Sequence, residues 1–379
     1  AWLIRLGLFL YDNLGGRKFL KGTSSLHLSN SKEGVPLKNK YLKAFEYSDC
    51  WIEDSRLVVL NARDAEIRGA KINVRTKVVS AEQIKGIWHL TLHSTIDDAT
   101  RVVKARMIVN AGGPWVEDII QNKVRLNSSE GVRLVRGSHL ITKKLYEHNK
   151  CYFFQGEDGR IIFTIPYETD FTLIGTTDVE HFDISIKPEC TLEEKKYLVN
   201  FASEYFETKV TIDDIVKTYS GVRPLYNDNA SSASAATRDY VLSIDETLGA
   251  PILNVFGGKI TTYRKLSENA LDKISKILPK VGASWTAGVP LPGGDFNIED
   301  LESLINKLSK KYNFLDQKWA LRLIKAYGTD AFELLGDCEN SKDLGVSFGA
   351  TLTEKEVIWL IKNEYAKTAD DIIWRRSKL

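Results

Sequence analysis

Residues 252–266, ILNVFGGKITTYRKL, join an apolar strand-like run to an amphipathic helical pattern through two adjacent glycines and a lysine. Two glycines let the backbone approach a ligand without a collision at Cβ. The N-terminus of the following helix, which we expect at the glycines, presents free N–H groups and a partial positive charge that suit a phosphate or the edge of a planar cofactor. The alternative is an ordinary tight turn, with Lys259 in solvent and Thr261 capping the helix. The P-loop consensus does not fit, because Leu253 and Ile260 stand at its ends.

Composition narrows the function classes. The chain has 379 residues, with 52 Lys+Arg against 50 Asp+Glu and a net charge of +2. The protein as a whole therefore has no strong positive electrostatic field that would attract nucleic acid. Its four cysteines form no C-x-x-C motif, which suits a reducing compartment. Its six histidines form no H-E-x-x-H motif, so no metal site is expected. No apolar run is long enough to span a bilayer.

The order of patterns predicts a mixed fold. Short alternating strands dominate from about 130 to 226, which indicates an antiparallel sheet. One helix interrupts them after Thr191, where Thr191 and Glu194 form a capping box. Thr353 and Glu356 predict a second capping box. The other expected elements are helices at 1–14, from Asp54, and at 298–312, 317–327, 354–366 and 369–378, strand-like runs at 71–83, 86–95 and 101–113, and a hairpin over 238–246 and 250–256.

Three cations are candidates for an anion pocket. Pro224 favours an extended backbone at Arg223, so this side chain projects predictably from a strand end. Arg238 stands across a loop of small residues from it. If both arginines converge with Lys259, they form a pocket for a phosphorylated or carboxylated substrate. The alternative is salt bridging, for example of Arg238 with Asp239 or Asp245.

Three further motifs are ambiguous from the sequence alone. Asn110-Ala111-Gly112-Gly113 ends a β-branched run, where glycines permit close approach to a nucleotide, but a plain strand-to-helix turn fits as well. His139, in RGSHLI, could accept a proton at neutral pH or serve as a structural hydrogen-bonding residue. Asp178, in IGTTDVE, has a turn residue as its default interpretation.

Taken together, the motifs resemble those of a known family. AWLIRLGLFLYDNLG, FEYSDCWIEDSRLV, VNAGGPW, RGSHLI, IGTTDVE, YSGVRPL, TRDYVL, FGGKITTYRKL and DDIIWRR occur in one order across the chain. This set resembles the FAD-dependent glycerol-3-phosphate dehydrogenases of the bacterial respiratory type. Ser267 replaces the alanine that usually ends the glycine-lysine motif.

The resemblance implies oxidation of sn-glycerol 3-phosphate to dihydroxyacetone phosphate, with hydride transfer to FAD and electrons passed to a membrane quinone. It implies that Arg223 and Lys259 face the glycerol hydroxyls, that Arg238 binds the phosphate and that His139 accepts a proton. FAD contacts are implied for Val78, for Asn110, Ala111, Gly112 and Gly113, and for Gly257, Gly258, Lys259, Thr261 and Thr262. It further implies a cytoplasmic protein that is peripheral on the inner membrane, and it leaves a homodimer open.

The resemblance also implies a fold of mixed α/β and α+β class. We expect a partial FAD-binding domain of the glutathione-reductase-like and glycine-oxidase-like type, an antiparallel substrate domain and a C-terminal helical domain. The expected segments are 1–44 (substrate or cap), 45–118 (FAD domain), 119–226 (substrate domain), 227–292 (FAD domain) and 293–379 (helical domain).

The family's G-x-G-x-x-G unit and its H-G-G-x-R-Y segment do not occur in these residues. We therefore expect a part of a longer protein that binds FAD poorly and is inactive by itself. Three alternatives stay open: a glycerophosphate oxidase that uses oxygen, a deaminating or hydroxyacid flavoprotein of the same fold, and an inert interaction or assembly domain.

Overall fold

The computed structural model describes residues 2–14, 20–128, 130–156, 159–228, 237, 239–279 and 282–379. Its contacts divide the chain into two compact units, and each unit combines segments that are distant in sequence. The first unit takes residues 1–50, 78–93 and 100–280, and the second takes 51–77, 94–99 and 281–379. The assignment of segments to FAD and substrate domains stays a prediction.

A six-stranded antiparallel sheet dominates the first unit, as the alternating pattern of residues 130–226 predicts. Two long strands of this sheet pair along their length, with Val135 opposite Arg223 and His139 opposite Tyr219. Directly opposed residues share a face, so this register decides which side chains meet. The strands are β7 (Val132–Lys143), β8 (Tyr152–Gln155), β9 (Ile161–Tyr167), β10 (Phe171–Gly175), β11 (Val179–Glu180) and β12 (Ile215–Tyr226).

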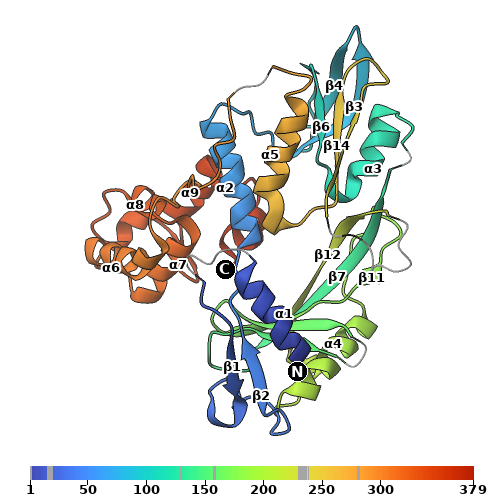
Figure 1. The fold of residues 1–379 in the computed structure, drawn as a ribbon. Helices are drawn as coiled ribbons and strands as arrows, with labels where there is room; N and C mark the ends of the chain where they lie inside the picture. The colour runs from blue at the N-terminus through green and yellow to red at the C-terminus, as the bar shows by residue number, and fades with distance from the viewer. Residues whose placement is uncertain are drawn as a thin grey trace. The chain divides into compact units, whose positions relative to one another are not determined.

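Helix α4 (Leu192–Tyr205) covers one face of this sheet (Figure 1). The capping box of Thr191 and Glu194 that begins the helix is confirmed. Leu140, Ile162 and Ile174 point toward this side and are fully buried with residues of α4 in one core cluster. Because strand side chains alternate, the neighbouring residues of β7 point to the opposite, open face.

A smaller mixed sheet, in the order β13-β14-β6, carries both glycine motifs. β13 (Val241–Asp245) and β14 (Ile252–Phe256) form the predicted hairpin, and every residue of β14 is buried. β6 (Ile108–Asn110) runs parallel to β14. The predicted single run at 101–113 is therefore wrong: it splits into β6 and β5 (Thr100–Ala105), which pairs with another sheet.

The remaining elements of the first unit complete its frame. β1 (Ser24–His27) pairs with β2 (Lys43–Glu46), and β3 (Thr76–Ile84), β4 (Ile87–Ser94) and β5 form a separate sheet. The short helix α3 (Val116–Asp118) and a π-helical turn at Ile119–Val124 follow β6, and α5 (Tyr263–Ile274) follows β14. Helix α1 (Trp2–Asn13) is confirmed at the expected place and has no buried residue.

The second unit is mainly helical and has its own core, which includes Tyr312, Tyr327 and Leu360. Thr353 is the N-cap residue of a helix, as predicted, but the capping box is wrong, because the Thr353 side chain makes no capping hydrogen bond. Glu356 instead accepts hydrogen bonds from Arg322 and from Tyr327, both of which are core neighbours. The helices are α2 (Asp54–Ile67), α6 (Leu301–Lys311), α7 (Gln317–Tyr327), α8 (Asp330–Leu335), α9 (Glu354–Asn363) and α10 (Ala369–Ile372), and the strands are β15 (Ser347–Gly349) and β16 (Leu352–Thr353).

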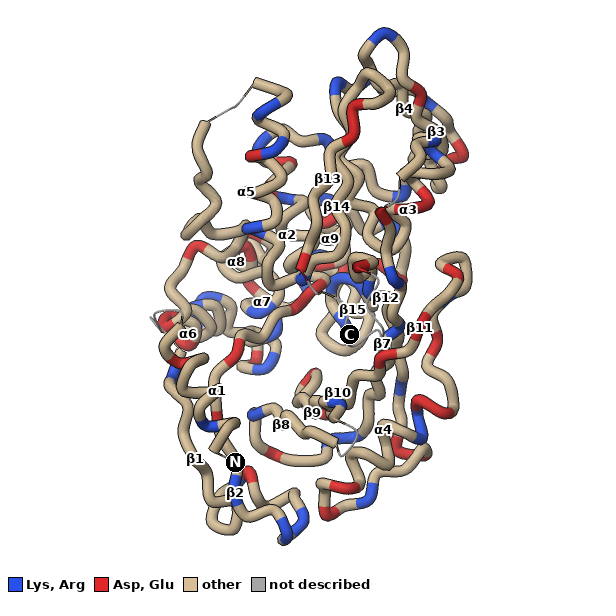
Figure 2. The backbone as a smooth tube through the Cα atoms, turned by 45° about the vertical axis from the view of Figure 1, so that its right-hand side comes forward, with Lys and Arg blue, Asp and Glu red and all other residues tan. Residues whose placement is uncertain are grey.

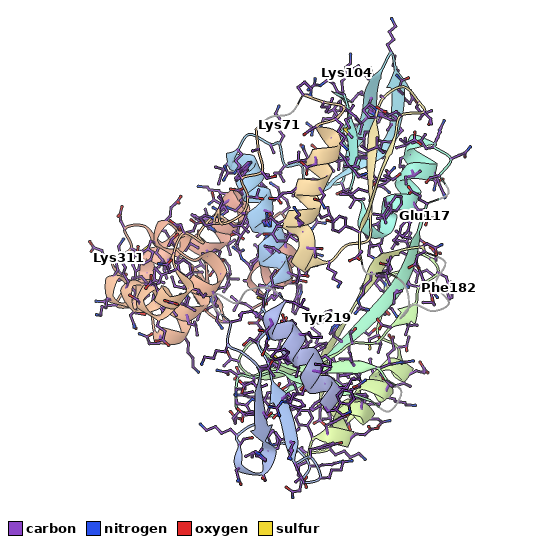
Figure 3. The ribbon with its side chains drawn as sticks, in the orientation of Figure 1. Lys71, Lys104, Glu117, Phe182, Tyr219 and Lys311 are labelled. Carbon is purple, nitrogen blue, oxygen red and sulfur yellow. The ribbon has the colours of Figure 1, made fainter. Side chains whose placement is uncertain are left out.

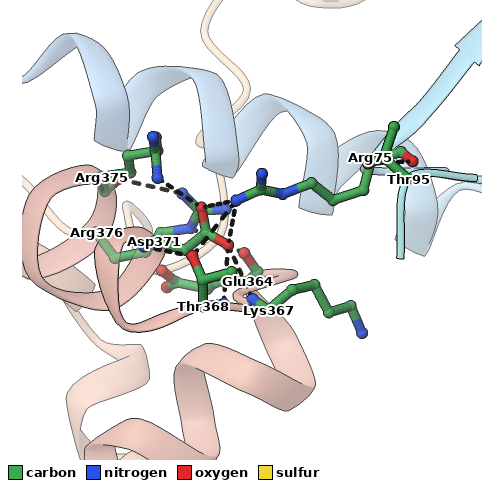
Figure 4. A network of polar contacts seen from close by, with 8 residues as sticks. All are labelled: Arg75, Thr95, Glu364, Lys367, Thr368, Asp371, Arg375 and Arg376. Carbon is green, nitrogen blue, oxygen red and sulfur yellow. Dashed lines mark hydrogen bonds and ion pairs between the residues drawn. The ribbon is translucent and has the colours of Figure 1, made fainter. Parts of the chain in front are cut away.

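The basic tail of the chain is tied into this unit by ion pairs (Figure 4). Asp371 accepts hydrogen bonds from Arg75 and Arg375, each at 2.9 Å, and from the backbone of Lys367 and Thr368. Burial opposes ionisation, yet these hydrogen bonds and the Arg75 charge hold the pKa of Asp371 far below its ordinary value. Arg375 of the tail thus contributes to packing within the second unit.

Basic and acidic residues are interspersed along the described backbone (Figure 2), in keeping with the net charge of +2. Among the described residues, none of the helices combines the length and apolar composition needed to span a bilayer.

Candidate functional site

Two glycine turns lie at the same end of the parallel pair β6 and β14. Asn254 of β14 is opposite Asn110, the last residue of β6. The Asn110 amide donates to Asn254 Oδ1 and to the carbonyl of Val116, both at 3.0 Å, and both asparagines are buried. The Oδ1 of Asn110 also accepts from the N–H of Gly112 at 3.3 Å. Asn110 therefore sets the position of the turn that follows it.

The second turn requires glycine. Gly257 and Gly258 have φ angles of 69° and 101°, in the left-handed region that favours glycine. A Cβ on Gly257 would lie 2.9 Å from the carbonyl oxygen of Asp239. A 3₁₀ turn at Ile260–Thr262 comes next, so the α-helix begins at Tyr263 and later than the sequence predicts. Thr262 donates its hydroxyl to the backbone carbonyl of Lys259 at 3.0 Å, and the Lys259 side chain is exposed.

These features fit a flavin nucleotide. Two glycine pairs, Gly112-Gly113 and Gly257-Gly258, lie at the carboxyl ends of β6 and β14, and each is followed by a helical turn. The carboxyl end of parallel strands, with helix N-termini beyond it, is the usual place for nucleotide phosphates and ring edges. Lys259 adds an exposed positive charge. Val78 belongs to β3, in a different sheet, and its contact with FAD stays a prediction.

The open face of the large sheet brings His139 and Arg223 together with Tyr219. In the register of β7 and β12, the pairs His139–Tyr219 and Val135–Arg223 are separated by the pair Gly137–Gly221. The His139 and Tyr219 rings stack with centroids 4.8 Å apart and planes 10° from parallel. Tyr219 is 44% exposed and lies on β12 (Figure 3). A Cβ on Gly221 would meet no atom within 4 Å, whereas the Arg223 guanidinium and Thr176 occupy the space over Gly137.

His139 is held neutral. Burial and, to a smaller extent, the Arg223 charge lower its pKa to about 4. Its Nδ1 is buried and has no hydrogen-bond partner among the described residues. A Cβ on Gly175 would lie 2.2 Å from the imidazole Cδ2, so the ring occupies the space that this glycine leaves. The arrangement provides a neutral, half-buried imidazole between Tyr219 and the Arg223 guanidinium.

Arg223 is fixed by the segment between β10 and β11. Its Nη1 forms an ion pair with Asp178 Oδ1 and lies 3.5 Å from the carbonyl oxygen of Thr177. Its Nη2 donates to Thr176 Oγ1 at 3.2 Å. A Cβ on Gly137 would lie 2.6 Å from that same Nη2. Asp178, whose default interpretation is a turn residue, is thus the carboxylate partner of the guanidinium.

The strand that carries Arg223 ends against the glycine-lysine turn. A Cβ on Gly257 would lie 3.7 Å from the Pro224 carbonyl oxygen and 3.4 Å from the Tyr226 nitrogen. The backbones that carry Arg223 and Lys259 are therefore in close contact. Arg238, the third predicted cation, lies outside the described residues. The convergence of all three cations stays a prediction.

Two residues that contact the candidate site were not predicted from the sequence in this role. Tyr219 gives no signal until the register of β7 and β12 is known. Glu194 is recognised only as a helix cap, although its carboxylate also accepts hydrogen bonds from the hydroxyls of Thr177 and Ser138.

Comparisons with known proteins agree with this arrangement. Residues 14–264 match the FAD dependent oxidoreductase family, and residues 284–379 match the C-terminal domain of alpha-glycerophosphate oxidase. A D-erythritol 1-phosphate dehydrogenase of Brucella abortus is 45% identical over 378 residues, which cover 100% of this chain and 75% of the relative. A glycerol-3-phosphate dehydrogenase of Pseudomonas aeruginosa is 45% identical over 380 residues, covering 100% and 73%.

A solved structure supports the fold. The glycerol-3-phosphate dehydrogenase of Bacillus halodurans, complexed with FAD, superposes with a TM-score of 0.75 and 24% sequence identity, over 94% of this chain and 73% of that one. The family match covers most of the chain and the relatives are matched over most of their lengths. This chain therefore belongs to the FAD-dependent glycerol-3-phosphate dehydrogenases.

Proposed function

We propose that this protein oxidises sn-glycerol 3-phosphate at its secondary hydroxyl group to dihydroxyacetone phosphate, with FAD as its cofactor. The observation that carries the proposal is one sheet face that holds both a neutral imidazole, His139, and a fixed guanidinium, Arg223. The strand of Arg223 ends against the Gly257 turn. When bound, FAD supplies the hydride-accepting chemistry. The residues of the chain bind and orient the substrate and handle the proton.

Arg223 and Lys259 are the groups we assign to the hydroxyls of the substrate. A guanidinium that is already held by Asp178 and Thr176 needs no reorganisation when negative charge develops on the reacting oxygen. Lys259 is exposed at the glycine turn and has no ion pair among the described residues, so its charge is available to an anion.

His139 is the group we assign to the proton of the secondary hydroxyl. A neutral imidazole can accept a proton, and its low pKa is caused by burial and by the Arg223 charge. A substrate anion beside it opposes the effect of the Arg223 charge and so raises the basicity of the imidazole. The free Nδ1 is a hydrogen-bonding position that the protein leaves unused.

Arg238 is assigned to the phosphate, and its substitution tests the function in the intact parent enzyme loaded with FAD. With dye-linked turnover, Arg238→Ala is expected to raise the KM for glycerol 3-phosphate about 10- to 100-fold, since charge-assisted hydrogen bonds are lost. A non-phosphorylated polyol should be affected about twofold at most. Equal losses for both substrates would remove Arg238 from the phosphate site.

D-Erythritol 1-phosphate is the second candidate substrate, because a dehydrogenase named for it is as similar to this chain as the Pseudomonas relative. Both compounds are polyol phosphates, so the same cations serve either. The ratio of kcat/KM values for the two compounds decides between them. No turnover of either compound by flavin-loaded protein would favour the inert-domain alternative.

We further infer that quinone accepts the electrons and that the enzyme binds peripherally to the cytoplasmic membrane surface. Helix α1 supports this, since Trp2, Leu3 and Phe9 are 75%, 66% and 62% exposed. Phe9→Glu is expected to weaken co-sedimentation with anionic lipid vesicles, whereas Val58→Glu, at an exposed position on α2, should leave it unchanged. Equal binding by both variants would remove α1 from the membrane contact. Faster reoxidation by oxygen than by a soluble quinone would favour the oxidase.

The homodimer also stays a prediction, and light scattering of the purified protein tests it.

A further inference from the structure

A buried carboxylate lies directly behind the proposed substrate face. Glu194, in the first turn of α4, is 5% exposed and accepts four hydrogen bonds. Two come from the Thr191 backbone at 2.9 Å and from Arg136 Nη2 at 3.0 Å. The other two come from the hydroxyls of Ser138 at 2.8 Å and Thr177 at 2.7 Å. A helix cap needs only the first of these contacts.

The contact with Thr177 links this carboxylate to the open face. Thr176, Thr177 and Asp178 are consecutive, and their side chains alternate across the chain. The Thr177 hydroxyl points back to Glu194 and also accepts the Ser138 N–H at 3.0 Å. Thr176 and Asp178 point forward and hold Arg223. Thr177 is 2% exposed, so its hydroxyl depends on these two buried partners.

The charge state of Glu194 suits this task. Burial raises its pKa, but the hydrogen bonds from Thr191, Thr177 and Ser138 and the Arg136 charge outweigh burial and lower the pKa below its ordinary value. The carboxylate is therefore ionised at neutral pH and acts as an acceptor only. An amide in its place would turn a donor toward hydroxyl and N–H groups that already donate.

We propose that Glu194 is a positioning residue for Arg223: it anchors Thr177 from behind, and Thr176 and Asp178 then hold the guanidinium toward the substrate. The inference rests on the proposed role of Arg223. Glu194 itself touches neither substrate nor cofactor. Its effect on turnover should pass entirely through Arg223.

A double-mutant cycle in the flavin-loaded enzyme tests this route. Glu194→Gln should lower kcat/KM for glycerol 3-phosphate about 10- to 100-fold, because small displacements of a charged group are costly to catalysis. Arg223→Gln should lower it at least as much. In the double variant, the loss should equal that of Arg223→Gln alone, since the two residues act as one unit.

Thr191→Ala is the matched control. It removes the hydroxyl side of the capping box and keeps the backbone N–H that reaches Glu194, so it should lower Tm by a few degrees with kcat/KM within about twofold of wild type. Thr177→Val removes the same link from the other side with little change in shape, and should reproduce the kinetic loss of Glu194→Gln. It also serves if Glu194→Gln does not fold.

The outcomes separate the two claims. If Arg223→Gln impairs turnover while Glu194→Gln and Thr177→Val do not, or if the losses multiply in the double variant, the positioning role is wrong and the proposed function stands. If Arg223→Gln leaves turnover unchanged, the role of Arg223 fails and the positioning role fails with it.

Discussion

The side-chain amide of Asn110 donates a hydrogen bond to Oδ1 of Asn254 at 3.0 Å, between two buried residues on neighbouring parallel strands. This contact ties together the ends of β6 and β14, from which both glycine turns begin. A change at Asn254 should therefore affect stability and the spacing of the two turns together.

Asn254→Ala is expected to lower the free energy of unfolding by about 1 to 3 kcal/mol, because it leaves the buried Asn110 amide without this acceptor. Urea unfolding measures the loss. Asn122→Ala, at an exposed position whose side chain donates to Asp118, is the control and should change the free energy by less than about 0.5 kcal/mol. Equal effects at both positions would contradict the structural role of the pair.

Gly175→Ala should disturb His139 directly. Its Cβ would lie 2.2 Å from the imidazole ring, so the ring or the strand must move, at a cost of about 1 to 3 kcal/mol in the free energy of unfolding. Gly221→Ala, on a strand of the same sheet, meets no atom within 4 Å and should be close to wild type in stability. Thermal unfolding of both variants checks the difference, and similar Tm values for the two would contradict the packing of His139 against Gly175.

Acid should destabilise the fold through His139. The pKa of this group is about 4 in the folded state and near 6.5 when unfolded, so the unfolded state binds the proton more readily. The resulting stability is present above pH 6.5 and is lost as the pH falls toward 4, by about 3 kcal/mol in total. Urea unfolding between pH 7.5 and 4 measures this loss.

His139→Gln should remove this part of the pH dependence, whereas His27→Gln, at an exposed position on β1, should retain it. A slope for His139→Gln that matches wild type would mean that other groups cause the acid sensitivity.

Glu364→Ala should be the most destabilising of these substitutions. Glu364 is fully buried and accepts a hydrogen bond from Arg56 Nη2 at 2.8 Å, so its removal leaves a buried guanidinium unpaired, at a cost of about 3 to 5 kcal/mol. Asp64→Ala breaks the more exposed pair with Arg68 and should cost about 1 kcal/mol or less. Chemical denaturation of both variants compares them, and equal midpoints would show that the Arg56 pair is dispensable.

Local patterns predicted the elements that depend on neighbours in sequence. Alternation indicated the antiparallel strands, and the capping box at Thr191 placed the start of α4. The capping box at Thr353 failed because Arg322 and Tyr327, distant in sequence, take the Glu356 carboxylate. Helix α8 gave no expected pattern, since it has only six residues.

The site was predictable in its residue types but not in its pairings. Arg223, His139 and the two glycine turns follow from motifs that the sequence displays. The ion pair of Arg223 with Asp178 spans 45 residues, and it depends on the register of β7, which no local signal reveals. Val78 was assigned by resemblance alone, and its sheet is separate from the one that carries the turns.

The interleaving of the two units constrains how the chain can be made. Arg56 and Glu364 are 308 residues apart, yet they share one helical unit. At a synthesis rate of roughly 5 to 20 residues per second, α2 is made about 15 to 60 s before the segment that contains Glu364. Meanwhile the whole antiparallel sheet has been translated. The helical unit can therefore close only after Glu364 has been made, and α2 waits without this partner while the antiparallel sheet is translated.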